Sequence, residues 1–206
     1  MKIKAVLLCT MFMLVTAGAS YAAGECWYGP TVGLGLPMGD FKDVASPNVA
    51  FGGVGTYMVN DQFGIGLDAG YHMWKGSDLL NAGLSGLFTI VNGSPVVAEA
   101  KWSAIQATLH GQINIPMEGS VKPYLRFGAG LYNVKLKITT DVLGDNDTSK
   151  SKVGLNGGVG ANIMANDKMA VGITGLYHYV PTKDDFGGNI SSITVQASLL
   201  FKAGGK

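Results

Sequence analysis

The stretch from Ser192 to Phe201, SITVQASLLF, alternates between two chemically different sets of residues. The first set is apolar: Ile193, Val195, Ala197, Leu199 and Phe201. The second set is polar apart from its last member: Ser192, Thr194, Gln196, Ser198 and Leu200. Successive side chains of a β-strand point to opposite faces. The stretch is therefore predicted to be a strand with one apolar face and one polar face.

The same alternation recurs along the chain and predicts seven further strands. They are expected at residues 27–38, 50–59, 63–74, 104–115, 121–137, 153–164 and 169–180. Short turns at 60–62, 117–120 and 165–167 alternate with longer connections at 39–48, 75–101, 139–152 and 181–189. An even number of strands, with short turns at one rim and longer loops at the other, is typical of a single-chain transmembrane β-barrel.

Composition supports a barrel that crosses a membrane. Glycine accounts for 31 of 206 residues, and only 14% of residues are charged, against about a quarter in soluble domains. A soluble sandwich or lipocalin-like barrel would carry Lys and Glu on its polar face, whereas here that face is Gly, Ser, Thr, Asn and Gln. The near-zero net charge of +1 gives no indication of a nucleic-acid partner.

The N-terminus predicts export. Lys2 and Lys4 precede an apolar run at 5–15, and Ser20-Tyr21-Ala22 matches the small-x-small cleavage pattern. The apolar run is shorter than the roughly 20 residues of a membrane-spanning helix. We therefore expect a cleaved signal peptide at 1–22 and one barrel domain at 23–206. The fold class is then all-β, an eight-stranded antiparallel transmembrane β-barrel.

Residues 123–130, PYLRFGAG, and the terminal strand resemble the small bacterial outer-membrane β-barrel family of OmpA/OmpX type, the porin family of barrel domains. The resemblance covers the whole mature chain. It implies a place in the outer membrane, with outer-membrane lipid and lipopolysaccharide as neighbours. It also implies assembly by periplasmic chaperones and the barrel-assembly machinery, with Phe201 ending the assembly signal strand.

Two charged residues lie well inside predicted strands, Asp68 and Arg126, and both are on the polar face beside His110. An isolated charge in a narrow lumen is costly. We therefore predict an Asp68–His110–Arg126 network that plugs the lumen. His72 and His178 also face inward, so a shared histidine metal site is the alternative, although their expected heights differ from that of His110. The prediction is that the chain binds no metal.

The connection at 75–101 is unusually apolar. Asn92-Gly93 suggests a hairpin turn, which predicts that the barrel strands extend outward as a hairpin. The alternative is a binding surface, or a loop folded over the barrel mouth to form an apolar pocket. The residues predicted to form that interaction surface are Leu84, Leu87, Phe88 and Ile90.

The expected function follows from what the barrel can enclose. Eight strands surround a space that side chains can fill, which argues against a general diffusion pore. The connections contain Ser94, Ser120, Ser149 and Ser151, none with a histidine nearby in the sequence. No catalytic residues, cofactor or enzyme activity are therefore predicted. We expect a structural or surface-interaction role through the extracellular loops, with the surface ligand unknown. The alternatives are a narrow channel for small or apolar solutes and, behind it, a lipid-modifying barrel enzyme.

Overall fold

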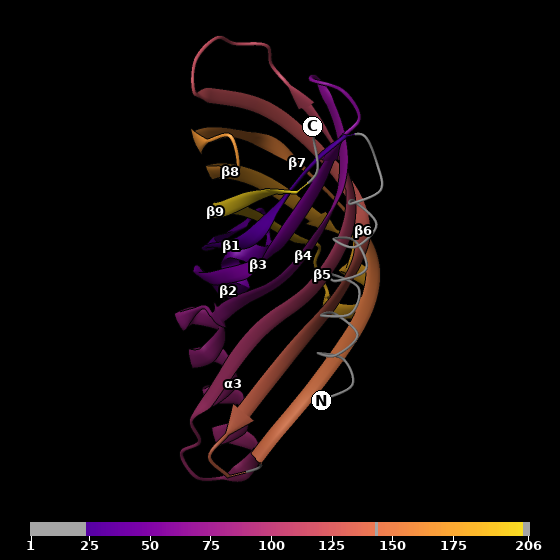
Figure 1. Ribbon diagram of the computed structural model, residues 1–206. Helices are drawn as coiled ribbons and strands as arrows, with labels where there is room; N and C mark the ends of the chain where they lie inside the picture. Colours follow the sequence, from indigo (N-terminus) through magenta and orange to yellow (C-terminus); the bar gives the residue numbers. More distant parts are fainter. Residues whose placement is uncertain (1–23, 143, 204–206) are drawn as a thin grey trace.

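Eight long strands form one closed antiparallel barrel in the computed structural model, which describes residues 24–142 and 144–203 (Figure 1). Each strand pairs with its neighbours in the order β1, β3, β4, β5, β6, β7, β8, β9, and β9 pairs with β1 to close the ring. The predicted eight-stranded barrel is thus confirmed. The strands are β1 (Glu25–Met38), β3 (Asn48–Met58), β4 (Phe63–Gly76), β5 (Ala98–Asn114), β6 (Val121–Thr140), β7 (Gly144–Asn166), β8 (Met169–Val180) and β9 (Ile190–Ala203).

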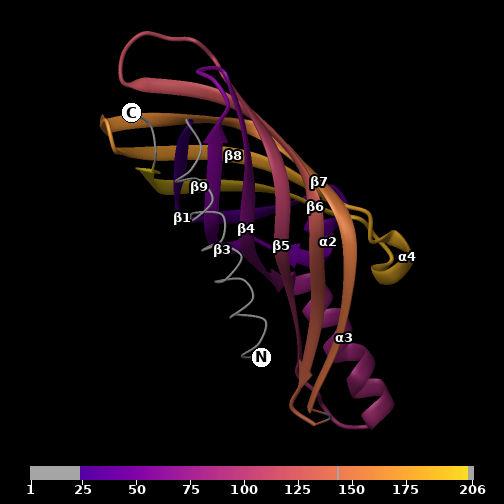
Figure 2. The ribbon, with the colours of Figure 1, turned by 45° about the vertical axis from the view of Figure 1, so that its right-hand side comes forward.

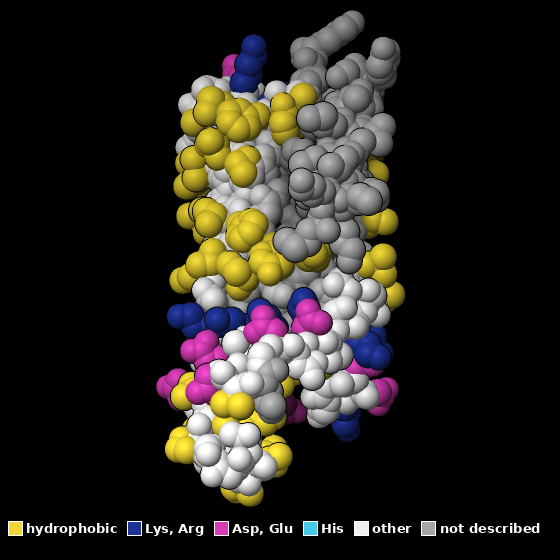
Figure 3. Space-filling view, turned by 90° about the horizontal axis from the view of Figure 1, so that it is seen from below, with side chains coloured by type: hydrophobic (Ala, Val, Ile, Leu, Met, Phe, Trp, Pro, Cys, Tyr) yellow, Lys and Arg dark blue, Asp and Glu magenta, His cyan; other side chains and the backbone are white. Residues whose placement is uncertain are grey.

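The alternation in the sequence becomes two barrel faces. Apolar side chains of one parity point outward, as Leu109 and Phe127 do with exposed fractions of 69% and 58%. Side chains of the other parity fill the interior, where Thr108 and Thr194 are buried. Figure 3 shows the hydrophobic side chains gathered over the barrel wall and the charged ones in a belt beside them. An apolar exterior is stable only against lipid.

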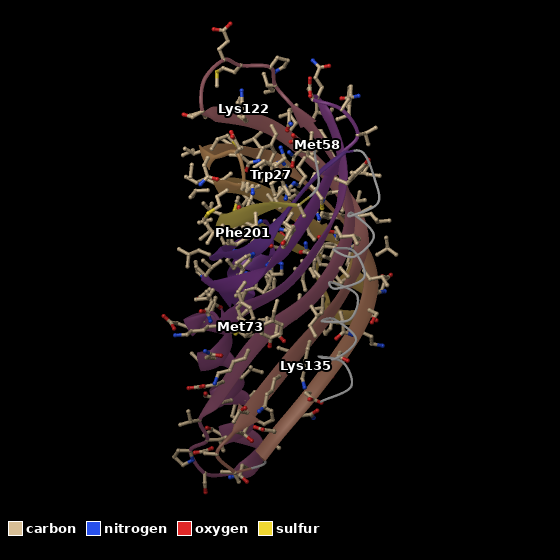
Figure 4. All side chains as sticks on the ribbon, in the orientation of Figure 1. Trp27, Met58, Met73, Lys122, Lys135 and Phe201 are labelled. Atoms are coloured by element: carbon tan, nitrogen blue, oxygen red, sulfur yellow. The ribbon has the colours of Figure 1, made fainter. Side chains whose placement is uncertain are left out.

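The two rims of the barrel are built differently (Figure 2). The turn end carries the tight β3–β4 and β7–β8 connections, the slightly longer β5–β6 connection, the start of β1 and the end of β9. The loop end carries the two-residue strand β2 (Ala45–Ser46) and three helices: α2 (Phe41–Val44), α3 (Asp78–Asn92) and α4 (Lys183–Phe186). In Figure 4, Lys122, Met58 and Trp27 lie towards the turn end, and Met73 and Lys135 lie towards the loop end.

The wall is taller on one side. β5, β6 and β7 contain 17, 20 and 23 residues, whereas β3 and β8 contain 11 and 12. The long connection predicted at 139–152 is wrong, because β6 and β7 pair as far as Thr140 and Gly144. Cross-strand ion pairs Lys135–Asp147 and Lys137–Asp145 support this extension.

The hairpin predicted at 75–101 is also wrong, because most of this connection forms the helix α3. Ser77 caps its N-terminus by accepting a hydrogen bond from the Leu80 backbone N–H at 3.2 Å. Gly93 ends it in the left-handed conformation, with φ of +73°. The Asn92-Gly93 step is therefore a helix C-cap rather than a hairpin turn, since both structures use the positive φ that glycine tolerates.

No helix in the described residues has the length and apolar character needed to cross a membrane. The predicted signal peptide at 1–22 lies outside the residues that the structure describes.

Candidate functional site

The lumen is interrupted near its middle by three charged or polar side chains from adjacent strands. Asp68 on β4 lies between His110 on β5 and Arg126 on β6. Its Oδ2 is 2.7 Å from His110 Nδ1, and its Oδ1 accepts a hydrogen bond from Arg126 Nη1 at 3.2 Å. All three residues are buried. The structure thus brings together the three residues that the sequence analysis grouped, and we call them the lumen network.

Neighbouring side chains add further hydrogen bonds to this network. Arg126 Nη2 donates to Gln112 Oε1 at 2.9 Å, and His110 Nε2 is 3.0 Å from Thr56 Oγ1. A Cβ on Gly66 would lie 2.6 Å from His110 Nε2, so the wall beside the imidazole has room only for glycine. Buried charges are tolerated where they are paired and hydrogen-bonded. Asp68 and Arg126 form such a pair, while Arg126 Nε has no hydrogen-bond partner among the described residues.

A second polar layer lies on the loop-end side of the lumen network. His72 Nε2 is 2.8 Å from Gln106 Oε1, and the His72 and His178 rings are 5.0 Å apart between centroids. Tyr132 Oη is 3.0 Å from His178 Nδ1 and accepts a hydrogen bond from Asn156 Nδ2 at 3.1 Å. A cavity of about 10 Å³ lined by Asp68, His72 and His178 among others has space for about one water molecule.

The three histidines do not share a site. His72 and His178 are together in the second layer, whereas His110 belongs to the lumen network. Within residues 24–142 and 144–203, no three His, Cys, Asp or Glu side chains are close enough to hold a metal ion. The geometry therefore does not support the shared histidine metal site.

Four aromatic rings close the loop end, and we call them the aromatic cap: Phe41, Trp74, Trp102 and Phe186. Phe41 of α2 packs edge-on against Trp74 and Trp102, with centroids 5.3 and 5.5 Å apart. Phe186 of α4 packs against the other side of Trp102 at 5.4 Å. Asp185, next to Phe186, is held by Lys150 and Lys152 of β7. The cap therefore joins two loops to the barrel wall.

The turn-end half of the lumen is hollow by comparison. A cavity of about 850 Å³ lies there, lined by apolar side chains such as Val54, Met164 and Leu200 and by polar ones such as Arg126 and Asn162. Trp27 and Glu25 lie at its mouth, where the indole N–H donates to the carboxylate at 3.4 Å. This cavity meets the lumen network at Arg126 and its partner Gln112.

The helix α3 is fastened along a free edge of the barrel. β4 ends at Gly76, opposite Ala45 of β2, and so leaves the first residues of β5 without a strand partner on that side. Side chains spaced one helical turn apart cover that edge. Asn81, Ser85 and Thr89 each accept a backbone N–H bond of 2.9 Å, from Ala100, Ala98 and Val96 respectively.

The outer face of α3 is apolar. Leu79, Leu87, Ile90 and Val91 have exposed fractions of 57–81%. Leu84 and Phe88 were also predicted for the interaction surface. They are half-buried, and so less exposed than the residues of the outer face. Phe201 pairs with Tyr28 of β1, with ring centroids 6.5 Å apart.

Several residues of these sites were not predicted from the sequence. The aromatic cap uses Phe41 and Phe186, which come from loops that carry no periodic pattern, so no sequence signal places them over Trp102. The fastening of α3 had a signal: Asn81, Ser85 and Thr89 are spaced by four residues, which indicates one face of a helix.

The comparisons with known proteins agree with this architecture. A family profile described as "Outer membrane protein beta-barrel domain" matches residues 5–201. No significant match was found among curated protein sequences.

Among solved structures, the chain is similar to a major outer membrane protein from Thermus thermophilus, with a TM-score of 0.58 and 11% identity. It is also similar to Ail, the attachment invasion locus protein of Yersinia pestis, and to the N-terminal β-barrel domain of Pseudomonas aeruginosa OprF. Both have TM-scores of 0.52, with identities of 14% and 12%. Each of the three alignments covers 87% of this chain and at least 99% of the other. With its closed barrel, its apolar outer wall and a profile match over residues 5–201, the chain belongs to the outer membrane protein beta-barrel domain family.

Proposed function

We propose that this outer-membrane barrel is a surface-interaction protein that acts through its loop end and does not conduct solutes. Outer-membrane barrels keep short turns in the periplasm and direct longer loops outward, so the loop end faces the exterior. The observation that carries the proposal is α3, whose outer face exposes Leu79, Leu87 and Ile90. Exposed apolar patches of this kind mark interaction sites.

The support under α3 makes this surface a rigid one. Two side chains of the helix bond to β5 and a third bonds to Val96, just before it, and β5 is paired with β6 over its whole length. Binding loses less conformational entropy when the contact surface is already ordered. A helix that only covered the strand edge would not need large apolar side chains on its far side.

The lumen supports a closed barrel. We propose that the lumen network and the aromatic cap act as two successive barriers, which disfavours the narrow-channel alternative. The expectation that the chain is not an enzyme remains part of this proposal. The barrels of Ail and OprF share the fold at identities of 14% and 12%, and similarity at that level does not select a role.

Adhesion of cells that display the protein tests the proposal. Retention on an alkyl-coated surface and on immobilised extracellular-matrix proteins is compared for the wild type and for L87S/I90S/V91S. We expect the triple variant to lose most of the retention. Ala82→Ser, on an exposed position of the same helix, is the matched control. Equal retention by all three proteins would contradict the proposal.

Planar-bilayer recording tests the closed lumen separately. The refolded wild-type barrel should be silent, with a heat-modifiable gel shift as the check that it has folded. Discrete, reproducible channels would favour the narrow-channel alternative.

A further inference from the structure

Three lysines lie side by side on the outer wall, opposite one another in the register of three neighbouring strands. In the strand register, Lys75 of β4 is opposite Lys101 of β5, and Lys101 is opposite Lys137 of β6. We call these three residues the lysine row. Directly opposite residues of antiparallel strands have Cα atoms about 4.5–5.5 Å apart, and like charges placed opposite each other destabilise a sheet. The repulsion between these lysines therefore lowers the stability of the fold.

The carboxylates on this wall do not neutralise all of the positive charge of the lysine row. Lys101 pairs with Glu99, but both side chains are more than half exposed, and such a pair contributes little. Lys137 pairs with Asp145 at 2.5 Å, and Asp147, which is opposite Lys137 in the register, pairs with Lys135. Among the described residues, none forms an ion pair with Lys75. Glu99 and Asp145 both lie farther from the barrel middle than the lysines do.

The height of the row places it at the edge of the membrane. Ile105 lies on β5 four residues from Lys101, towards the barrel middle. On β6, Leu131 lies four residues from Lys135, a lysine next to the row. Both Ile105 and Leu131 are exposed apolar side chains.

Along each strand, one neutral polar residue lies between the lysine and the apolar residue: Ser103 on β5 and Asn133 on β6. On β5 and β6 the wall thus passes outward from lipid-facing apolar residues through one neutral polar residue to lysines. Glu99 and Asp145 lie beyond the lysines, and Asp147 lies opposite Lys137. Figure 3 shows basic and acidic side chains together in a belt beside the hydrophobic band.

We propose that the lysine row binds the phosphate groups of lipid A in the outer leaflet of the outer membrane. Lipid A is a phosphorylated, multiply acylated disaccharide, so its acyl chains would lie against the apolar wall while its phosphates reach the level of the lysines. Lysine ammonium groups are strongly hydrated point charges that bind phosphate. Phosphate oxygens between neighbouring lysines also relieve the repulsion within the row. The proposal rests on the family's membrane location and not on the role of α3.

Competition between two lipids tests the proposal. The folded barrel is mixed in non-ionic detergent with equal amounts of bisphosphorylated lipid A and its chemically dephosphorylated form, and bound lipids are counted by native mass spectrometry. We expect the wild type to prefer the phosphorylated lipid at least tenfold. In K101Q/K137Q this preference should fall by about 30-fold or to parity, because each lysine near a charged membrane surface contributes roughly a fivefold factor.

The matched control is K122Q/K168Q, which removes two lysines from the turn end and should keep the wild-type preference. Lys75→Gln, which breaks no ion pair, is the second test variant if K101Q/K137Q does not fold, and it should reduce the preference about fivefold. Unchanged preference in a folded row variant, or an equal loss in the control, would overturn the proposal. Displacement of lipid A by millimolar inorganic pyrophosphate would overturn the assignment to a membrane lipid.

Discussion

The two halves of the lumen have the same strands around them and yet are filled in opposite ways. The loop-end half contains the aromatic cap and the layer of His72, His178 and Tyr132, and the cavity beside His72 and His178 is only about 10 Å³. The turn-end half contains a cavity of about 850 Å³. The number of strands sets the width of a barrel, so this difference is due to the size of the inward side chains. Barrel architecture alone therefore does not decide whether an outer-membrane barrel conducts.

The largest expected effect comes from the boundary between the two halves. Asp68→Ala leaves Arg126 buried without its counter-charge, and breaking a buried pair from one side costs about 3–5 kcal/mol. Urea unfolding in lipid vesicles measures the loss. The double variant D68A/R126M should recover much of it, because no unpaired charge remains. Asp61→Ala, in an exposed turn-end connection, should change stability by no more than about 0.5 kcal/mol. An Asp68→Ala barrel as stable as the wild type would rule out the lumen network as a stabilising plug.

The aromatic cap should give the next effect. Phe41 is buried and contacts both Trp74 and Trp102, so Phe41→Ala should cost about 3 kcal/mol. The variant should nevertheless stay silent in planar bilayers, because the lumen network lies below the cap. If Phe41→Ala alone produced discrete channels, the cap would be the only barrier and the two-barrier description would be wrong.

A smaller effect is expected where α3 meets β5. Asn81 accepts a hydrogen bond from the Ala100 N–H and donates one to the Gly76 carbonyl at 3.3 Å. Asn81→Ala should weaken this attachment by about 1 kcal/mol, which corresponds to roughly fivefold faster hydrogen exchange at the Ala100 amide. Asn92→Ala, at the exposed end of the same helix, should leave that exchange rate unchanged. Equal exchange in both variants would mean that α3 does not protect the edge of β5.

The smallest effect concerns pH at α4. Hydrogen bonds from Lys152 and Lys150 hold the pKa of Asp185 below its ordinary value, which is about 3.9. A carboxylate with a lowered folded-state pKa stabilises the fold above its unfolded pKa, and this contribution is lost as pH falls through the folded pKa. We therefore expect α4 to loosen only below about pH 4, as measured by amide exchange at Phe186. Asp185→Asn should remove this pH step, and a step that persists in the variant would assign it to another group.

The lumen network could be predicted because its residues were conspicuous. Asp68 and Arg126 are the charges that the alternating pattern places well inside strands, and parity puts both in the lumen with His110. Strand register then brings them together, since β4, β5 and β6 are consecutive neighbours. The cap could not be predicted in this way, because Phe41 and Phe186 belong to loops whose path over the mouth depends on packing against Trp74 and Trp102.

The connection at 75–101 shows why one local signal was misleading. Asn92-Gly93 suits both a hairpin turn and a helix C-cap, since each needs a residue with positive φ. The neighbouring backbone favours the helix. β5 and β6 continue beyond the end of β4, and an unpaired strand edge is stabilised when acceptors bind its N–H groups. A helix offers Asn81, Ser85 and Thr89 to that edge at the spacing of its turns.

By itself, the sequence determined the barrel, its membrane-facing wall and the residues inside it, because a period of two assigns each side chain to a face from local information. Only the tertiary structure decided how much of the lumen is filled, where α3 lies, and that Lys75, Lys101 and Lys137 form a row. Those features depend on contacts between residues far apart in the chain, and their energies arise only once register and closure have brought the strands together.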